Sequence, residues 1–163
     1  MDIIQIVGYK NSGKTTIAAQ FIEYAINKGI RTASLKHHGH GGKPEGIKDT
    51  DSEKHSQAGA VISGVEGGNV FQLSKENWTV EEMIYIYSMM HIDLLVMEGF
   101  KSCSFPKVLL VSREEELELL DQVENVQAII TQVALEKHSY PFPVFHVSEI
   151  NRIYKWLEEQ LQN

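Results

Sequence analysis

The feature of this sequence that most constrains its fold is the pattern G-x-x-x-x-G-K-[ST], which residues 8–15 satisfy as GYKNSGKT. A short β-branched run, residues 3–7, precedes the pattern, and in residues 15–28, which follow it, apolar side chains recur at three- and four-residue spacings. A buried strand, a glycine-containing turn and an amphipathic helix in this order are typical of a phosphate-binding loop. We therefore expect a central parallel strand that leads through this loop into a helix.

Each residue type in the loop suits a bound nucleoside triphosphate. Gly8 and Gly13 allow successive backbone N–H groups to turn inward around phosphate oxygens, and the N-terminus of the following helix adds attraction. The ammonium of Lys14 would neutralise the β- and γ-phosphates, and the hydroxyl of Thr15 would bind the accompanying Mg²⁺. The pattern predicts a nucleotide-binding protein.

An acidic residue is expected at the end of a neighbouring strand, where a carboxylate reaches the magnesium shell. The apolar run at residues 94–97 ends in Glu98 and Gly99, which makes Glu98 the preferred acid. Asp93 begins the same strand, about 13 Å away at the usual rise per residue, and is expected to be structural.

A loop rich in glycine, histidine and lysine, residues 37–48, follows a predicted strand at residues 30–36. Lys36, His37 and His38 lie nearest to the strand end, where the loops of a parallel sheet converge on a ligand. These side chains would contact phosphate or a partner protein, and a solvated loop is the simpler alternative.

Two further metal interpretations stay open. His37, His38 and His40 permit a transition-metal site, although the only cysteine, Cys103, is far away in the sequence. Asp51 would either contact Mg²⁺ through water or cap a short helix that runs to about residue 58.

The rest of the chain alternates predicted strands and helices. Further strands are expected at residues 94–97, 107–111, 126–130 and 143–147. Helices are expected after the capping-box pairs Thr79/Glu82 and Ser112/Glu115 and over residues 149–161. The runs at residues 60–64 and 69–74 flank a turn sequence at 65–68 and predict a β-hairpin.

This order of elements predicts an α/β fold of the P-loop NTPase type. Parallel strands need crossover connections that usually carry a helix, so we expect a mostly parallel open sheet with helices on both faces, plus the β-hairpin as an extension. The length of 163 residues suits a single nucleotide-binding domain over residues 1–163.

Charge and composition exclude several classes of protein. A net charge of −7 has the wrong sign for a protein that coats nucleic-acid phosphates. A single cysteine suits a reducing cytosol, and no stretch approaches the roughly 18 to 20 apolar residues that span a bilayer. We expect a cytoplasmic protein that binds neither nucleic acid nor membrane.

Four segments, GYKNSGKTT, KHHGH, DTDSEKHSQAGA and DLLVMEGFK, occur in an order and at spacings that resemble the MobB family, molybdopterin-guanine dinucleotide biosynthesis protein B, over residues 1 to about 101. The resemblance implies a GTP-binding accessory protein, often a homodimer, that cooperates with a MobA-type guanylyltransferase when GMP is joined to molybdopterin. Its own GTP hydrolysis would be slow. The cofactors implied are GTP and Mg²⁺.

The resemblance also assigns residues. The nucleotide-binding set that it implies is Gly8, Lys10, Asn11, Ser12, Gly13, Lys14, Thr15, Thr16, Lys36, His37 and His38. The magnesium candidates are Thr15, Glu98 and Asp51, and any catalytic role would fall to Lys14 and Glu98.

Two departures from related proteins limit what this resemblance implies. The sequence contains no Asn-Lys-x-Asp guanine reader, and Gln132, at the end of a predicted strand, is the substitute we consider. Lys10 lies two residues after Gly8, whereas related dimeric ATPases place a signature lysine one residue after that glycine, which argues against catalysis by Lys10 across a dimer.

The leading hypothesis is thus a nucleotide-dependent adaptor, and two alternatives remain. In a small P-loop kinase, the histidine and lysine loop would hold the acceptor while Lys14 stabilises the transferring phosphoryl group. In a metallochaperone GTPase, the histidines of the same loop would bind the metal.

Overall fold

The computed structural model describes residues 1–39, 51–135 and 139–161. The chain divides into two compact units, one formed by Met1–His37 with Tyr87–Asn163 and the other by His38–Ile86. We describe each unit by itself, and the expectation of a single domain stays a prediction.

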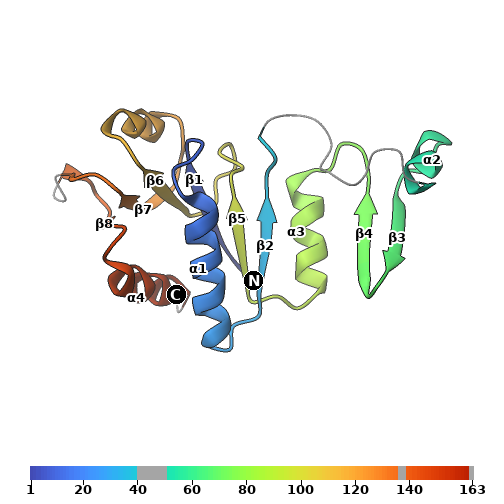
Figure 1. Cartoon of the computed structure of the whole chain (residues 1–163), viewed down its shortest axis with the longest axis horizontal. Coiled ribbons are helices and arrows are strands. Elements are labelled where there is room, and N and C mark those ends of the chain that lie inside the picture. Colours follow the sequence, from blue (N-terminus) through green and yellow to red (C-terminus); the bar gives the residue numbers. More distant parts are fainter. Residues whose placement is uncertain (40–50, 136–138, 162–163) are drawn as a thin grey trace. The chain divides into compact units, whose positions relative to one another are not determined.

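The first unit is built on a six-stranded sheet in the order β2-β5-β1-β6-β7-β8, and each neighbouring pair is parallel (Figure 1). Its strands are β1 (Asp2–Gly8), β2 (Thr32–Lys36), β5 (Leu94–Glu98), β6 (Lys107–Val111), β7 (Val126–Thr131) and β8 (Val144–His146). β1 lies inside the sheet between β5 and β6, as its β-branched composition predicts. The predicted open α/β sheet is confirmed.

Two apolar layers cover the two faces of this sheet. Successive residues of a strand point to opposite faces, so Val108 and Leu110 of β6 join one cluster while Leu109 and Val111 join the other. The first cluster is closed by α1 (Lys14–Asn27) and α4 (Ile150–Leu161), and the second by the 3₁₀ helix η1 (Glu114–Asp121). Helical segments thus cover both faces.

Helix α1 follows the predicted pattern closely. Its residues Ile17, Phe21 and Ala25 are buried at four-residue spacing, which places one apolar stripe against the sheet. Gly29, with φ of 80°, follows the helix end and supplies the left-handed conformation expected there. The helix that follows the glycine-containing loop, and includes its last residues Lys14 and Thr15, is therefore anchored in the core.

The second unit contains α2 (Asp51–Gln57) and an antiparallel hairpin of β3 (Ser63–Gly67) and β4 (Val70–Ser74). The hairpin is confirmed, but its turn lies two residues after the predicted one. Gly68 and Asn69 both have positive φ, 58° and 63°, as a tight two-residue hairpin turn requires. Gly67 pairs with Val70. Of the two glycines in the predicted turn, Gly67 therefore belongs to β3 and only Gly68 lies in the turn.

Helix α3 (Val80–Met89) begins with the predicted capping box. The backbone N–H of Glu82 donates to Thr79 Oγ1 at 3.2 Å, and the N–H of Thr79 donates to Glu82 Oε2 at 3.0 Å. The helix spans the boundary between the units. At its end the hydroxyl of Tyr87 donates to the carbonyl of Ser34 in β2 at 2.8 Å.

The second capping-box prediction is wrong. Ser112 is bonded to Glu116, whose Oε2 accepts from the backbone N–H at 2.8 Å and from the hydroxyl at 2.9 Å, and no such pair forms with Glu115. The following segment is the 3₁₀ helix η1 and not an α-helix, and Arg113 precedes it without a side-chain cap. The helix begins one residue later than predicted, with Arg113 at its N-cap, so Glu116 and not Glu115 is the third helical residue, the position from which an acidic side chain reaches back past the helix start.

No helix within the described residues combines the length and the apolar character needed to cross a bilayer.

Candidate functional site

The carboxyl ends of three adjacent strands meet at one edge of the sheet. Glu98, the last residue of β5, pairs with Ile6 of β1 and with Lys36, the last residue of β2. β1 ends at Gly8, where the predicted phosphate-binding loop, residues 8–15, begins. The parallel register therefore brings the loop, the acid and Lys36 together, as the edge of a parallel sheet usually does for its ligand-binding groups.

Close packing explains why glycine begins the loop. A Cβ atom on Gly8 would lie 2.7 Å from Ser12 Oγ and 2.8 Å from the backbone oxygen of Leu110. Gly13, at the N-cap of α1, has φ of 92°, and Asn11 has φ of 65°. These conformations turn the loop back on itself before the helix starts.

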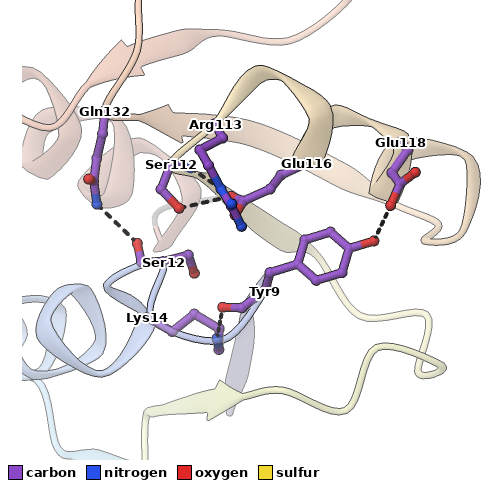
Figure 2. A network of polar contacts seen from close by, with 8 residues as sticks. All are labelled: Tyr9, Ser12, Lys14, Ser112, Arg113, Glu116, Glu118 and Gln132. Atoms are coloured by element: carbon purple, nitrogen blue, oxygen red, sulfur yellow. Dashed lines mark hydrogen bonds and ion pairs between the residues drawn. The ribbon is translucent and has the colours of Figure 1, made fainter.

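Ser12 is the polar group most deeply enclosed by the loop. Only 2% of the residue is exposed, and its Oγ has no hydrogen-bond partner among the described residues. A buried hydroxyl without a partner is costly, and a bound anion is one way to satisfy it. Figure 2 shows the side chain of Gln132 approaching the same residue, with its Nε2 3.4 Å from the carbonyl oxygen of Ser12.

The side chain of Lys14 folds back over the loop. Its Nζ donates to the carbonyl oxygen of Tyr9 at 2.5 Å (Figure 2). Burial lowers the pKa of Lys14 below its usual value, and the nearby charges of Lys101 and Lys36 lower this pKa further, while Glu98 acts in the opposite direction. A cation in this setting gains from an anionic ligand, which would favour its charged form.

Thr15, Glu98 and Lys36 form a closed polar triangle. Thr15 Oγ1 lies 3.0 Å from both carboxylate oxygens of Glu98 and donates to them. Lys36 Nζ lies 3.0 Å from Thr15 Oγ1 and 3.0 Å from Glu98 Oε1. A hydroxyl and a carboxylate side by side are oxygen ligands of the kind that Mg²⁺ takes, so this donor set fits the ion.

The turn after β5 is held by a residue that the sequence reasoning missed. Gln5, fully buried in β1, donates from Nε2 to the carbonyl oxygens of Gly99 at 3.2 Å and Phe100 at 2.8 Å. Gly99 and Phe100 both have positive φ, 88° and 55°. An amide in the middle of an apolar β-branched strand was the available signal, because a buried polar group needs partners.

This turn also brings Lys101 to the loop and packs against His37, the residue after β2. Lys101 Nζ lies 4.6 Å from the centre of the Tyr9 ring, and the rings of His37 and Phe100 are 5.1 Å apart. Lys101 was part of the family segment DLLVMEGFK but was not among the predicted site residues. Together with Lys14 and Lys36 it makes this end of an acidic protein locally basic.

A polar network joins the loop to the segment after β6 (Figure 2). The hydroxyl of Tyr9 donates to Glu118 Oε1 at 2.6 Å, and this hydrogen bond is the main reason why the pKa of Tyr9 is raised. Arg113 Nη2 lies 3.4 Å from Glu116 Oε1, so this exposed guanidinium is paired with a buried carboxylate. The loop is thus connected to η1 through Tyr9.

The predicted site residues fall into three groups. Those that the structure brings to the loop and the strand ends beside it are Gly8, Lys10, Asn11, Ser12, Gly13, Lys14, Thr15, Thr16, Lys36, His37 and Glu98. His38 is described as an exposed residue beyond β2. Asp51 begins α2 in the second unit, where its Oδ1 accepts from Lys54 Nζ at 2.7 Å.

The histidine-rich loop cannot be assigned in the same way. Residues 40–50, and with them His40, lie outside the described residues. Across the parts of the chain that are described, no group of three or more His, Cys, Asp or Glu side chains is placed to hold a metal ion. The transition-metal interpretation stays a prediction.

Comparison with known proteins gives consistent results. The sequence model of MobB, molybdopterin guanine dinucleotide synthesis protein B, matches residues 3–132. A probable molybdopterin-guanine dinucleotide biosynthesis adapter protein of Bacillus subtilis is 38% identical over 149 residues, covering 90% of this chain and 86% of that protein. The corresponding adapter protein of Haemophilus influenzae is 28% identical over 137 residues, covering 82% of this chain and 76% of that protein.

Solved structures agree over nearly the whole chain. The crystal structure of Bacillus subtilis MobB superposes with a TM-score of 0.81 at 36% identity and covers 97% of both chains. A MobB homologue from Bacillus stearothermophilus superposes with a TM-score of 0.78 at 30% identity and covers 99% of both chains. The similarity therefore extends beyond the loop of residues 8–15, into the last third of the chain, where the sequence motifs are absent.

Proposed function

Because this chain belongs to the MobB family, we propose that it is a nucleotide-dependent adaptor in the biosynthesis of molybdopterin guanine dinucleotide. It binds GTP with Mg²⁺, associates as a homodimer and acts on a MobA-type guanylyltransferase in the cytoplasm. Its own hydrolysis of GTP is slow, and the main effect of GTP binding is a change in the surface that the protein offers to its partner.

One observation carries this proposal: the loop of residues 8–15 encloses the unpartnered hydroxyl of Ser12, while Thr15 Oγ1 lies 3.0 Å from the carboxylate of Glu98. An anion in the loop would give Ser12 its missing partner, and Mg²⁺ would bind the oxygens of Thr15 and Glu98, which already lie side by side. The arrangement suits a phosphate chain with its metal ion better than it suits either ligand alone.

In this proposal each side chain has a defined role. Lys14 leaves the carbonyl of Tyr9 and binds the terminal phosphates, because an anion is a stronger partner than a neutral oxygen. Thr15 binds the metal ion, and Glu98 orients the metal's ligands directly or through water. The backbone N–H groups of the loop and of the first turn of α1 surround the phosphates, with Lys10 and Thr16 at its edge.

Slow hydrolysis is inferred from how the remaining polar side chains near the loop are engaged. Gln132 donates to the carbonyl of Ser12, and Arg113 pairs with Glu116. Fast hydrolysis needs a group that positions the attacking water and a cation that stabilises the transition state. We therefore expect binding, and not turnover, to be the function of the site.

Calorimetry tests the binding site directly. GTP, ATP and their diphosphates are titrated with and without Mg²⁺ into the native chain and into Lys14→Ala, and we expect GTP to bind most tightly and the variant to lose at least about tenfold in affinity. Lys28→Ala is the matched control, since Lys28 lies beyond the end of α1 and pairs with Glu158 at 2.6 Å. Unchanged nucleotide affinity of Lys14→Ala would contradict the proposed binding site. Tighter binding of ATP than of GTP would contradict the proposed preference for guanine.

A second experiment tests the adaptor role. Affinity for a purified MobA-type guanylyltransferase is measured with a non-hydrolysable GTP analogue and with GDP. A ligand shifts a conformational equilibrium only by its differential affinity for the two states, so the adaptor role requires the partner to bind the two forms differently. Equal affinities would leave nucleotide binding intact and exclude nucleotide-dependent adaptation.

The homodimer is proposed to form through the hairpin, residues 60–73. Its apolar side chains are largely exposed, including Phe71 at 64% and Val70 at 66%. Contiguous exposed apolar residues often mark an interface. Sedimentation of the native chain as a monomer at all concentrations would exclude this.

The two alternative functions stay open to simple assays. Transfer of labelled γ-phosphate to a metabolite would support the kinase, and tight binding of Ni²⁺ or Zn²⁺ would support the metallochaperone.

A further inference from the structure

The polar triangle at the end of β5 has an unusual third member. Thr15 and Glu98 are the expected pair for a magnesium site, but Lys36 Nζ contacts both, at 3.0 Å from Thr15 Oγ1 and 3.0 Å from Glu98 Oε1. The hydroxyl of Thr15 donates its one hydrogen to Glu98 and accepts from Lys36. A single ammonium group therefore occupies lone pairs of both oxygen ligands.

The exposures of the two charged groups differ. The side chain of Glu98 is 11% exposed, whereas that of Lys36 is 57% exposed. The carboxylate is held at the end of a buried strand, and an uncompensated charge there would be costly. The lysine, at the last position of β2 and on a flexible four-carbon stem, can leave at low cost because most of it already lies in water.

A divalent ion and this ammonium cannot share the same ligands. Mg²⁺ binds oxygen at about 2.1 Å, so an ion on Thr15 and Glu98 would approach within a few ångströms of Lys36 Nζ, and the two cations would repel. Lys14, the other cation whose charge acts on Glu98, instead donates to the carbonyl of Tyr9. Lys36 is therefore the cation that would compete with the metal ion for Thr15 and Glu98.

We propose that Lys36 is a tethered cation that holds Thr15 and Glu98 in place in the nucleotide-free protein and must be displaced before the metal ion binds. This role rests on the proposed function and describes the regulation of the same site. The apparent affinity for free metal is reduced by the fraction of molecules in which Lys36 occupies the ligands. When nucleotide arrives with the metal, its phosphates offer the displaced ammonium a new partner, so metal binding becomes conditional on nucleotide.

Titration with Mn²⁺ as the probe, followed by the electron paramagnetic resonance signal of the free ion, tests the proposal on the full chain. Without nucleotide, we expect Lys36→Met to bind Mn²⁺ about fivefold more tightly than the native protein, as expected for removing a competing, partly exposed ion pair. With GTP present the gain should shrink or reverse, because the variant also loses its phosphate contact.

Two further variants identify the cause of any gain. Lys101→Met removes a positive charge from the same end of the sheet, but Lys101 lies over the ring of Tyr9. It should change Mn²⁺ affinity by clearly less than Lys36→Met, whereas an equal gain would reduce the effect to general electrostatics and overturn the proposal. The double variant Lys36→Met/Glu98→Gln should lose the gain, since the Glu98 carboxylate that Lys36 no longer contacts is the source of that gain.

The outcomes separate the two proposals. If the native protein binds Mn²⁺ with GTP but Lys36→Met shows unchanged nucleotide-free affinity, the tethered cation is wrong and the nucleotide site stands. If the native protein binds no Mn²⁺ even with GTP, the proposed function itself fails. Circular dichroism and thermal unfolding of each variant verify that the comparison is made between folded proteins.

Discussion

The six-stranded sheet and the β3–β4 hairpin use apolar residues in opposite ways. Phe21 of α1 is fully buried against the sheet, whereas 64% of Phe71 in β4 is exposed. The sheet has helical segments on both faces, while a two-stranded hairpin has too little surface to bury its own side chains. The difference shows that the sheet buries its apolar residues within its own unit, whereas those of the hairpin stay exposed, as the proposed homodimer interface requires.

The strongest test of this comparison replaces one phenylalanine in each region. Phe21→Ala should lower the free energy of unfolding by about 3–5 kcal/mol, because it opens a cavity in a packed core. Phe71→Ala should lower it by less than about 1 kcal/mol, because an exposed ring loses little on truncation. Urea denaturation at a concentration where the protein is monomeric measures both effects.

The same pair of variants tests the hairpin's external role. Sedimentation should show that Phe71→Ala weakens self-association. A loss of several kcal/mol of monomer stability on replacing Phe71 would instead mean that the hairpin is packed like the core.

A smaller effect is expected from paired glycine substitutions. Gly8→Ala should cost about 1–3 kcal/mol, because its Cβ would meet Ser12 Oγ and the backbone oxygen of Leu110. Nucleotide binding should fall as well, since the loop must move to accept the methyl group. Gly67→Ala in β3 is the control. A Cβ there meets nothing within 4 Å, so the change should stay within about 0.5 kcal/mol.

Thermal unfolding and calorimetry with nucleotide measure the two consequences of Gly8→Ala separately. If both glycine variants behaved alike, the tight approach of β6 to the loop would play no part in stability.

The smallest effect concerns a buried carboxylate. Burial raises the pKa of Glu116, but hydrogen bonds from Ser112 and Arg113 outweigh burial and hold this pKa below its usual value. The folded-state pKa is depressed, so the carboxylate contributes stability above the unfolded-state pKa of about 4.3 and loses it as the pH falls through the folded-state value. Glu116→Gln should therefore cost about 1 kcal/mol at neutral pH and progressively less in acid.

Denaturation curves between neutral and strongly acidic pH check this dependence. Glu66→Gln, an exposed carboxylate of β3, is the matched control and should leave stability nearly unchanged across the range. A cost for Glu116→Gln that stayed constant with pH would show that its hydrogen bonds do not depend on ionisation.

Local signals in the sequence were read correctly where one interaction decides the structure. Thr79 and Glu82 form their capping box because both partners are three residues apart and their bonds close within one turn. Ser112 and Glu115 have the same spacing, yet Glu116 takes the role, since η1, with Leu119 buried in the core, begins one residue later, with Arg113 at its N-cap. Packing overrode local spacing there.

The site shows the same division. The sequence pattern singles out Lys14, Thr15 and Glu98, because only a few residue types suit the roles proposed for them, and the structure brings the three side chains near one another while their roles stay predictions. Lys101 and Gln5 were missed, because their importance depends on the turn after β5, where Gly99 and Phe100 bring the chain back to the loop. Rules about residue spacing along the sequence do not describe a turn that brings the chain close to a loop about 90 residues earlier.

The sequence alone determined the strand, loop and helix around residues 8–15 and the alternation that leads to a parallel sheet, because these depend on neighbours along the chain. Only the tertiary structure decided that Lys36 contacts both Thr15 and Glu98, and that the hydroxyl of Ser12 is enclosed without a partner among the described residues. Those contacts join β2, β5 and α1 through the register of the sheet, which is set by packing over the whole unit.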